Sequence, residues 1–384
     1  MTLETVSTQT RTPSQENLWI EVDLGRILSN LDALRLKIRP YTRVMAVIKA
    51  NAYGHGLVPV AKALEGKVDF LGIGSLKEAS ILREQAVTTP LFLFGRLLKD
   101  QISLALQTNL TLTVSSFEEA SQISETAKLY SKEVSVHLKV DTGMGRLGIP
   151  LRDAAAEIER VAGLPALRLE GIYTHFPAAE RYPEDGGEKA LKDFEDLIQN
   201  LRRKEISFSL RHAANSAGAL RLKSPHLNLV RPGLALYGIY PDRSLEPELT
   251  LQAALSLKTR IIFLKRLQAG DSVGYARQFV ASKPTTIAVL PVGYAHGIPI
   301  HLSEKGEVLC HGKRFPFAGR VCMDLLMIDL GNFRDARVGD EVVLIGNSAG
   351  EQIRTEDMAW QSQTIPYEIV TRLDPGVPRF YPSI

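Results

Sequence analysis

The chain has 384 residues, 45% of them hydrophobic, and 46 lysines and arginines against 43 acidic residues give a net charge of +3. This composition is typical of a globular protein with two or three domains. A charge this close to zero, without a basic block, argues against nucleic-acid and anionic-membrane partners and favours a small ligand. The only two cysteines, Cys310 and Cys322, show no zinc-ligand spacing, so we expect a cytoplasmic protein without a metal site.

The N-terminal region combines a polar segment with the first predicted elements. Residues 1–15 are rich in Ser and Thr, and we expect a disordered tail there. A strand-like segment at 19–23 and an amphipathic stretch at 28–38 follow. No apolar stretch in the chain approaches the roughly 18 residues that a membrane span needs.

Eight short apolar segments then recur at fairly even spacing. They cover residues 44–48, 70–73, 90–94, 110–114, 134–140, 169–173, 208–212 and 227–230. Between them lie helix-like segments, at 75–85, 116–131, 151–162 and 188–204. This alternation predicts parallel β/α units, and eight such units close a TIM (β/α)8 barrel, which we assign to residues 16–248.

From about Leu251 the pattern changes. Strand-like runs follow one another with turn signals between them, and a long helix is expected only at 351–361. We therefore predict an α/β protein whose barrel is followed by a mainly-β domain over residues 249–384.

The active site of such a barrel lies where the strands end, so the residues after each run carry the chemical signal. Lys49 follows five apolar residues, where desolvation would lower its pKa and make the amine a Schiff-base nucleophile. The alternative is a lysine that only extends from a strand end toward water.

The last two runs are followed by residues that suit a phosphate. Asn215 and Ser216 follow the seventh run, and Arg231-Pro232-Gly233 follows the eighth. A hydroxyl and backbone amides at these late loops are common phosphate ligands in barrels. Together with an imine-forming lysine they suggest pyridoxal 5'-phosphate. A plain turn at Gly233 and a helix cap at Ser216 remain alternatives.

The segment Gly143-Met-Gly145-Arg-Leu-Gly148 matches the glycine pattern of a dinucleotide-binding loop. However, it follows the fifth strand rather than the first, and Pro150 puts the next helix beyond the glycines. We do not expect dinucleotide binding there.

Several longer motifs occur in one order along nearly the whole chain. They cover residues 46–56, 137–148, 173–176, 214–216, 230–233, 273–275, 291–295, 319–324 and 366–368. In this order they resemble the alanine racemase family of pyridoxal-phosphate enzymes, which have a barrel and a β domain. The resemblance implies interconversion of L-alanine and D-alanine, with D-alanine supplied for peptidoglycan.

The resemblance also implies roles for two bases, one on each face of the substrate. Lys49 would attach the cofactor covalently and exchange the α-proton on one face. Tyr275, from the other subunit of a homodimer, would do so on the opposite face. Both side chains have reference pKa values near 10, so their neighbours must lower them. For Tyr275, the resemblance implies His175 and Arg146 as those neighbours.

The remaining implied roles concern the cofactor and the substrate. Arg231 would face the pyridine nitrogen, and because a guanidinium keeps its proton, the ring becomes a poorer electron sink, which disfavours transamination. Lys139 would be carbamylated, since a carbamate attracts the neighbouring Arg146 whereas an ammonium repels it. The other implied cofactor-binding residues are Arg146 at the phenolic oxygen, Tyr53, Ser216, Tyr367, Gly233 and Leu234 at the phosphate, and His175 and Asn215. Arg146 and Met323 would contact the substrate, with Tyr294 and Asp324 at the entrance.

Two positions depart from the family pattern. His296 stands where an acid is usual, and Leu325 stands where glutamine is common. Both fall in the entrance region, so we expect any difference in side-chain preference or pH dependence to arise there. A broad-specificity or serine racemase is the closest alternative function. A decarboxylase would be expected to put an acid in place of Arg231, and a non-catalytic cofactor carrier would end near the eighth strand.

Overall fold

The computed structural model describes residues 12–177, 179, 187–221, 227–246 and 249–382. The chain forms two compact units, Gly25–Gln252 and a second one that joins Met1–Leu24 to Ala253–Ile384. Within the described residues, no helix combines the length and the apolar character needed to cross a membrane. Of the expected N-terminal tail, residues 1–11 lie outside the described residues, and Pro13–Gln15 forms a short 3-10 helix.

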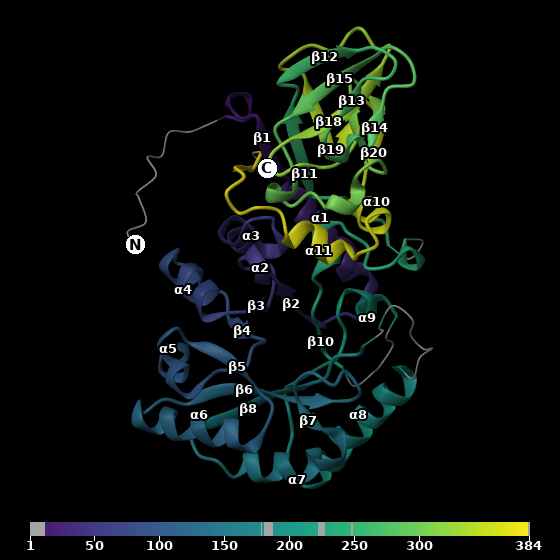
Figure 1. Ribbon diagram of the computed structural model, residues 1–384. Helices are drawn as coiled ribbons and strands as arrows, with labels where there is room; N and C mark the ends of the chain where they lie inside the picture. Colours follow the sequence, from purple (N-terminus) through teal and green to yellow (C-terminus); the bar gives the residue numbers. More distant parts are fainter. Residues whose placement is uncertain (1–11, 178, 180–186, 222–226, 247–248, 383–384) are drawn as a thin grey trace. The chain divides into compact units, whose positions relative to one another are not determined.

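The first unit is a nearly closed barrel of parallel strands (Figure 1). Eight strands follow one another in the order β10-β2-β3-β4-β5-β6-β8-β9. They are β2 Arg43–Val47, β3 Phe70–Ile73, β4 Leu91–Leu93, β5 Leu110–Val114, β6 Val134–Asp141, β8 Leu167–Tyr173, β9 Leu210–His212 and β10 Leu229–Val230. This confirms the TIM-barrel prediction, and each of the eight apolar runs overlaps one of these strands.

The first and last strands of this order are joined by backbone hydrogen bonds of the flanking residues. The amide of Asn228 donates to the carbonyl of Arg211 at 3.0 Å, and the amide of Arg231 donates to Ala214 at 2.8 Å. These bonds draw the loops after β9 and β10 together. Residues after β9 and β10 therefore lie beside each other at one end of the barrel.

Helices alternate with the strands. Ser75 and Ser116 cap two of them, each accepting a hydrogen bond from the amide three residues on. The helices of this unit are α1 Leu24–Lys37, α3 Leu57–Leu64, α4 Leu76–Glu84, α5 Ile102–Gln107, α6 Phe117–Leu129, α7 Leu151–Ala162, α8 Gly187–Arg203 and α9 Ser216–Arg221. The sequence analysis did not predict α3, α5 and α9, because they are too short to show a clear helical period of apolar residues.

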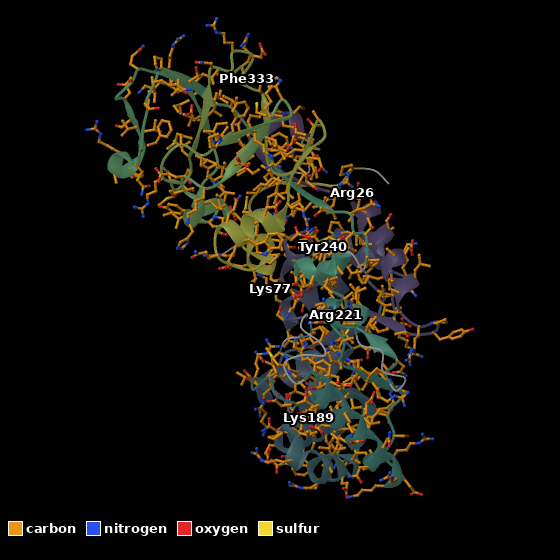
Figure 2. All side chains as sticks on the ribbon, turned by 90° about the vertical axis from the view of Figure 1, so that its right-hand side faces the viewer. Arg26, Lys77, Lys189, Arg221, Tyr240 and Phe333 are labelled. Atoms are coloured by element: carbon orange, nitrogen blue, oxygen red, sulfur yellow. The ribbon has the colours of Figure 1, made fainter. Side chains whose placement is uncertain are left out.

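The interior of the barrel is largely apolar. Met45, Phe70, Phe92, Tyr173, Leu210 and Leu229 form one buried cluster. A second cluster of this unit packs Tyr240, labelled in Figure 2, with Phe176 and Leu191. Two histidines, His137 and His212, are also fully buried on β6 and β9. Buried imidazoles in such surroundings need hydrogen-bond partners.

The second unit is built from mainly antiparallel sheets, with one parallel pair, β1 and β21. One sheet has the order β17-β16-β19-β11-β1-β21, with β20 beside β19, and another has the order β12-β15-β18. The large sheet contains β1 Leu18–Val22, β11 Leu255–Arg260, β16 Glu307–Cys310, β17 Lys313–Pro316, β19 Glu341–Ser348, β20 Glu351–Ile353 and β21 Arg379–Phe380. The remaining elements are β12 Phe263–Leu267, β13 Ser272–Val273, β14 Phe279–Val280, β15 Thr285–Leu290, β18 Leu326–Gly331, α10 Thr355–Gln361 and α11 Pro366–Thr371.

Two segments differ from the expectation. The strand at 19–23, which we counted in the barrel, pairs instead with β11 and β21 of the second unit. Residues 351–353, expected to begin a helix, pair with β19 as a strand. The partner β11 of the first segment is remote in the sequence, so the local apolar pattern does not reveal it. The second segment instead forms a hairpin with the strand just before it, across the two residues Ala349 and Gly350.

Candidate active site

Lys49 lies directly after β2, at the start of an unusual left-handed turn. Ala50, Asn51, Ala52 and Tyr53 all have φ between 53° and 55°. For residues other than glycine this conformation costs about 1–2 kcal/mol each, so tertiary contacts must hold it. The side chain of Asn51 does so by accepting a hydrogen bond from the amide of Leu57 at 2.8 Å. Strain of this kind is characteristic of functional sites.

The environment of Lys49 favours its neutral amine. Burial lowers the pKa of Lys49, and the nearby charge of Arg146 lowers it further, while Glu78 acts in the opposite direction. Glu78 is itself held in place, because its Oε2 accepts a hydrogen bond from the Gly74 amide at 2.8 Å. The desolvation expected from the five preceding apolar residues is therefore present.

The turn brings Tyr53 against the loop that follows β10. A Cβ atom built on Gly233 would lie 2.8 Å from the Tyr53 Oη, so any larger residue there would displace the tyrosine. The buried Ser216 Oγ accepts a hydrogen bond from the Gly233 amide at 2.9 Å. Tyr53, Ser216 and Gly233, expected to bind one phosphate, thus lie together.

Asn215 and Leu234 flank this group. The side chain of Asn215 accepts a hydrogen bond from the Gly218 amide at 2.9 Å and so caps α9. The helix-cap role considered for Ser216 is therefore filled by Asn215. Leu234 is fully buried at the start of a 3-10 helix, Leu234–Tyr237.

Arg231 is buried, with 3% of its surface exposed, and is held in one orientation. Its Nη2 donates to the carbonyls of Thr174 and Ala213, both at 2.9 Å, and its Nη1 lies 2.7 Å from Nδ1 of His212. Burial lowers the pKa of Arg231 to about 10, which still leaves it charged at neutral pH. Within the described residues, no group accepts a hydrogen bond from its Nε, so that N–H can serve a ligand.

Two further cations approach from β6 and the loop after it. Lys139 is buried, and this burial, together with Arg146 and Arg231, lowers its pKa to about 8. Arg146 is exposed, on a turn where Asp141 accepts hydrogen bonds from the Gly143 and Gly145 amides. The glycines of this segment therefore serve a turn between β6 and β7 (Ile149–Pro150), and α7 begins only after them.

His175, two residues beyond β8, is a neutral side chain in this surrounding. Burial and the charges of Arg231, Arg146, Lys139 and Lys49 lower its pKa to about 3. Its Nδ1 lies 3.4 Å from Nη2 of Arg231 and is the acceptor of that contact, so the proton is on Nε2. His175 can therefore lower the pKa of Tyr275 only by offering a hydrogen bond, because it carries no positive charge.

The charges at this end of the barrel have one chemical consequence. Arg146 lowers the pKa of Lys49, and Arg146, Arg231 and Lys49 all lower that of Lys139, with Glu78 and Asp141 as acidic neighbours. Such a concentration of cations around partly buried space fits a ligand that carries several negative charges. A phosphorylated cofactor together with an amino-acid carboxylate meets this requirement.

The predicted residues of the second unit lie on its surface. Tyr275 is 69% exposed and Met323 is 54% exposed. The loops of Tyr294 and Met323 are tied together, because the Tyr294 amide donates to the Cys322 carbonyl at 3.0 Å. Asp324 is exposed beside Met323, whereas Tyr367 is half-buried on α11. The roles expected for these five residues stay predictions.

Several contributors were not expected from the sequence. The charge of Glu78 acts on Lys49, His212 contacts Arg231 directly, and Tyr237 packs against Tyr53 with ring centroids 5.2 Å apart. The sequence offered one signal, for His212: a histidine interrupts the otherwise apolar run 208–212.

In the second unit, donor atoms of Cys310, His311 and Asp340 lie within 4.8 Å of one another. Because His311 and Asp340 are already paired at 2.7 Å, this group is explained without a metal ion.

Known proteins resemble the chain over nearly its full length. Family models described as the N-terminal and C-terminal domains of alanine racemase match residues 22–241 and 254–381. The alanine racemase of Desulforamulus reducens is 42% identical over 370 residues, which cover 96% of this chain and 99% of that protein.

Solved structures agree with this similarity. An alanine racemase from Clostridium difficile superimposes with a TM-score of 0.89 at 32% identity, covering 95% of this chain and 96% of the other. One from Bacillus anthracis with bound L-Ala-P gives 0.88 at 35% identity, covering 96% and 95%. The chain therefore belongs to the alanine racemase family of enzymes.

Proposed function

We propose that the protein interconverts L-alanine and D-alanine with pyridoxal 5'-phosphate as its cofactor. The observation that carries this proposal is the meeting, at one end of one barrel, of Lys49, Arg231 and the group Tyr53, Ser216 and Gly233. In a member of this family, the arrangement supplies an amine of lowered pKa, a fixed cation and a phosphate cradle.

The residues present fit the cofactor. Lys49 would attach it covalently, and Tyr53, Ser216 and the amides near Gly233 and Leu234 would hold its phosphate, with Tyr367 as a further ligand. The available Nε of Arg231 would meet the pyridine nitrogen, and Arg146 the phenolic oxygen. Asn215 and His175 would support this set. When bound, the cofactor withdraws electrons from the α-carbon of an amino acid and makes its proton more acidic.

Racemisation needs one base on each face of the α-carbon. Lys49 would hold or release the proton on one face, where its lowered pKa brings the neutral amine closer to physiological pH. Tyr275 of the partner subunit would act on the other face. The high exposure of Tyr275 and Met323 supports a homodimer in which the second unit completes a neighbouring barrel and contacts its substrate.

Arg231 would steer the reaction toward racemisation. Its several hydrogen bonds and its pKa of about 10 keep it charged, so it would keep its proton and would not pass it to the pyridine nitrogen. With that nitrogen left unprotonated, the cofactor would be a weaker electron sink, and the proton would return to the α-carbon. Transamination is thereby disfavoured.

Lys139 would be carbamylated, with the carbamate drawing the exposed Arg146 into a fixed position. The biological role we propose is supply of D-alanine for peptidoglycan in the cytoplasm. The entrance would contain Tyr294 and Asp324. The departures at His296 and Leu325 lie in that region, so a broader amino-acid range is the second candidate function.

The decisive experiment incubates purified full-length protein with L-alanine, with and without added cofactor, and follows the loss of optical rotation. L-serine, L-lysine and L-arginine are compared at equal concentration. We expect cofactor-dependent racemisation, fastest with alanine. No loss of rotation with alanine would contradict the proposal, and faster loss with another amino acid would favour the broad-specificity alternative.

A further inference from the structure

A line of buried polar side chains leads away from Arg231 into the barrel. Nη1 of Arg231 lies 2.7 Å from Nδ1 of His212, and Nε2 of His212 lies 2.8 Å from Nδ1 of His137. Nε2 of His137 then lies 3.4 Å from Oε2 of Glu170. Both histidines are fully buried. The line crosses from β10 through β9 and β6 to β8.

The chemistry of arginine dictates the direction of every hydrogen bond in this line. A guanidinium can only donate, so Nδ1 of His212 carries no proton and its Nε2 carries one. His212 must then donate to Nδ1 of His137, which leaves the proton of His137 on Nε2, facing Glu170. The reverse order, or a positively charged His137, would set two N–H groups against each other at His212 or at Arg231.

The far end of the line is a carboxylate that otherwise lacks a partner for one oxygen. Within the described residues, Oε2 of Glu170 and Nε2 of His137 have no other hydrogen-bond partner. The 3.4 Å between them is longer than a formed hydrogen bond and needs only a small movement to close. Oε1 of Glu170 pairs with Nη2 of Arg168 at 3.2 Å.

Glu170 also borders a cavity at the end of the barrel where the strands begin. This cavity has a volume of about 460 Å³, and Arg43, Arg168 and Glu133 contribute to its lining. The candidate active site lies at the opposite ends of the strands. The line of side chains therefore connects the buried arginine with a polar opening on the other end of the same barrel.

We propose that His212, His137 and Glu170 are positioning residues, which hold Arg231 in one orientation and stabilise its positive charge from the far end of the barrel. The negative charge of Glu170 polarises the Nε2–H of His137, which strengthens His137 Nδ1 as an acceptor and in turn His212 Nδ1. This inference rests on the proposed function for the role of Arg231, but the hydrogen-bond line itself does not depend on it.

The alternative is that the two histidines only fill space in the core. Both packed imidazoles make ring contacts, His137 with Phe92 at 4.8 Å and His212 with Tyr173 at 4.7 Å between centroids. Packing alone would not fix which ring nitrogen carries the proton. It would also not transmit a change at Glu170 to His212.

The test records nitrogen NMR spectra of full-length protein whose eight histidines carry ¹⁵N. Among the described residues only His55, His137 and His212 are buried histidines, so their imidazole protons are protected from exchange. We expect His137 and His212 both to carry their proton on Nε2 and to stay neutral from about pH 6 to pH 8.5, since burial lowers both pKa values. The surrounding charges are Arg231 at one end and Arg168 and Arg43 at Glu170.

Glu170→Gln then removes the charge while keeping the shape, and Glu133→Gln is the matched control because Glu133 lines the same cavity and is exposed. We expect Glu170→Gln to move the Nε2–H resonance of His137 upfield and that of His212 less, in the same direction. Glu133→Gln should move neither. For alanine, kcat should fall about threefold to tenfold in Glu170→Gln at unchanged KM.

An Nδ1–H form of either histidine, titration of either one within this pH range, or equal effects of the two Gln variants would overturn the proposal. An unfolded Glu170→Gln variant would leave the tautomer test in the unchanged protein, which decides by itself. If the spectra are as expected but alanine is not racemised, the proposed function fails and the hydrogen-bond line stands.

Discussion

The two units expose their predicted functional residues in opposite ways. In the barrel, Lys139 and Arg231 are 4% and 3% exposed, burial lowers the pKa values of both, and the charge of Arg231 lowers that of Lys139 further. In the second unit, Tyr275 and Met323 are 69% and 54% exposed. The barrel therefore holds buried, positively charged side chains at its candidate site, whereas the second unit exposes its predicted side chains.

This difference indicates what each unit needs in order to form an active site. The cations of the barrel gain from an anionic ligand, so the barrel needs only the cofactor and the substrate. A large aromatic ring and a thioether on an exposed loop gain little in water, and exposed apolar side chains close together commonly mark an interface. The comparison therefore predicts a site shared between subunits, and the experiments below can break or sharpen it.

The largest effect is expected for the two bases. Lys49→Ala and Tyr275→Phe should each lower the alanine racemisation rate at least about 10⁴-fold, because each removes the proton carrier on one face. The rate is followed by optical rotation. Circular dichroism should show both variants folded, since Tyr275 is exposed and Lys49 is only partly buried, with its amine 5.9 Å from the centre of the Phe94 ring.

Mixing these two inactive variants tests whether the site is shared. After exchange of subunits, half of the dimers contain one variant of each kind, and one of their two sites combines an intact Lys49 with an intact Tyr275. The mixture should recover about one quarter of the unmodified rate. No recovery, with exchange verified by mass spectrometry, would mean that both bases act within one chain.

Lys139 should show a smaller effect and a clear pH dependence. Carbamylation joins the neutral amine to carbon dioxide and releases a proton, so it needs the unprotonated form. Because the pKa of Lys139 is lowered to about 8, occupancy at fixed dissolved carbon dioxide should rise from pH 6 to pH 9. The ¹³C NMR signal of a carbamate formed from labelled carbon dioxide measures it.

The matched variant Lys139→Ala should remove that signal and lower kcat about 10-fold to 100-fold, because Arg146 loses the group that positions it. A carbamate signal that survives in Lys139→Ala would come from another lysine. In that case the prediction that the buried Lys139 reacts with carbon dioxide in preference to exposed lysines would be wrong.

Gly233 tests the phosphate cradle. An alanine at this position would place its Cβ 2.8 Å from the Tyr53 Oη, so Gly233→Ala should displace the tyrosine. Displacing the tyrosine should weaken cofactor binding about tenfold, measured by fluorescence titration. In the double variant Tyr53→Phe with Gly233→Ala the clash is smaller. The double variant should therefore lose less cofactor-binding free energy than the two single variants lose together. Full additivity would contradict the contact.

Much of the fold was predictable because of one physical property. Parallel barrel strands are buried on both faces, so each appears as a short apolar run, and all eight runs overlap a strand. The strand at Leu18–Val22 looks the same locally, yet it pairs with β11 more than 200 residues away. A run of apolar residues does not show which sheet it joins.

The site was predictable to the extent that its residues follow strand ends. Lys49, Ser216 and Arg231 do so, and the structure brings them to one end of the barrel, while their roles stay predictions. The left-handed turn at 50–53 was not predictable, because it contains no glycine and is held by Asn51 and distant contacts. His212 was missed because a histidine within an apolar run gives no sign of its partners.

The smallest effect is expected at the predicted entrance in the second unit, where His296 and Leu325 differ from the residues usual in the family. Nδ1 of His296 accepts a hydrogen bond from the Gly293 amide at 3.1 Å, a role that an aspartate can also fill, so His296→Asp should fold normally. The substitution puts a carboxylate in place of an imidazole, which adds a negative charge at the predicted entrance. The KM for alanine, measured at several pH values, should therefore differ about twofold between the unmodified protein and His296→Asp. The exposed His301→Asp is the control for the change of charge alone, and equal KM curves for all three proteins would remove His296 from the entrance.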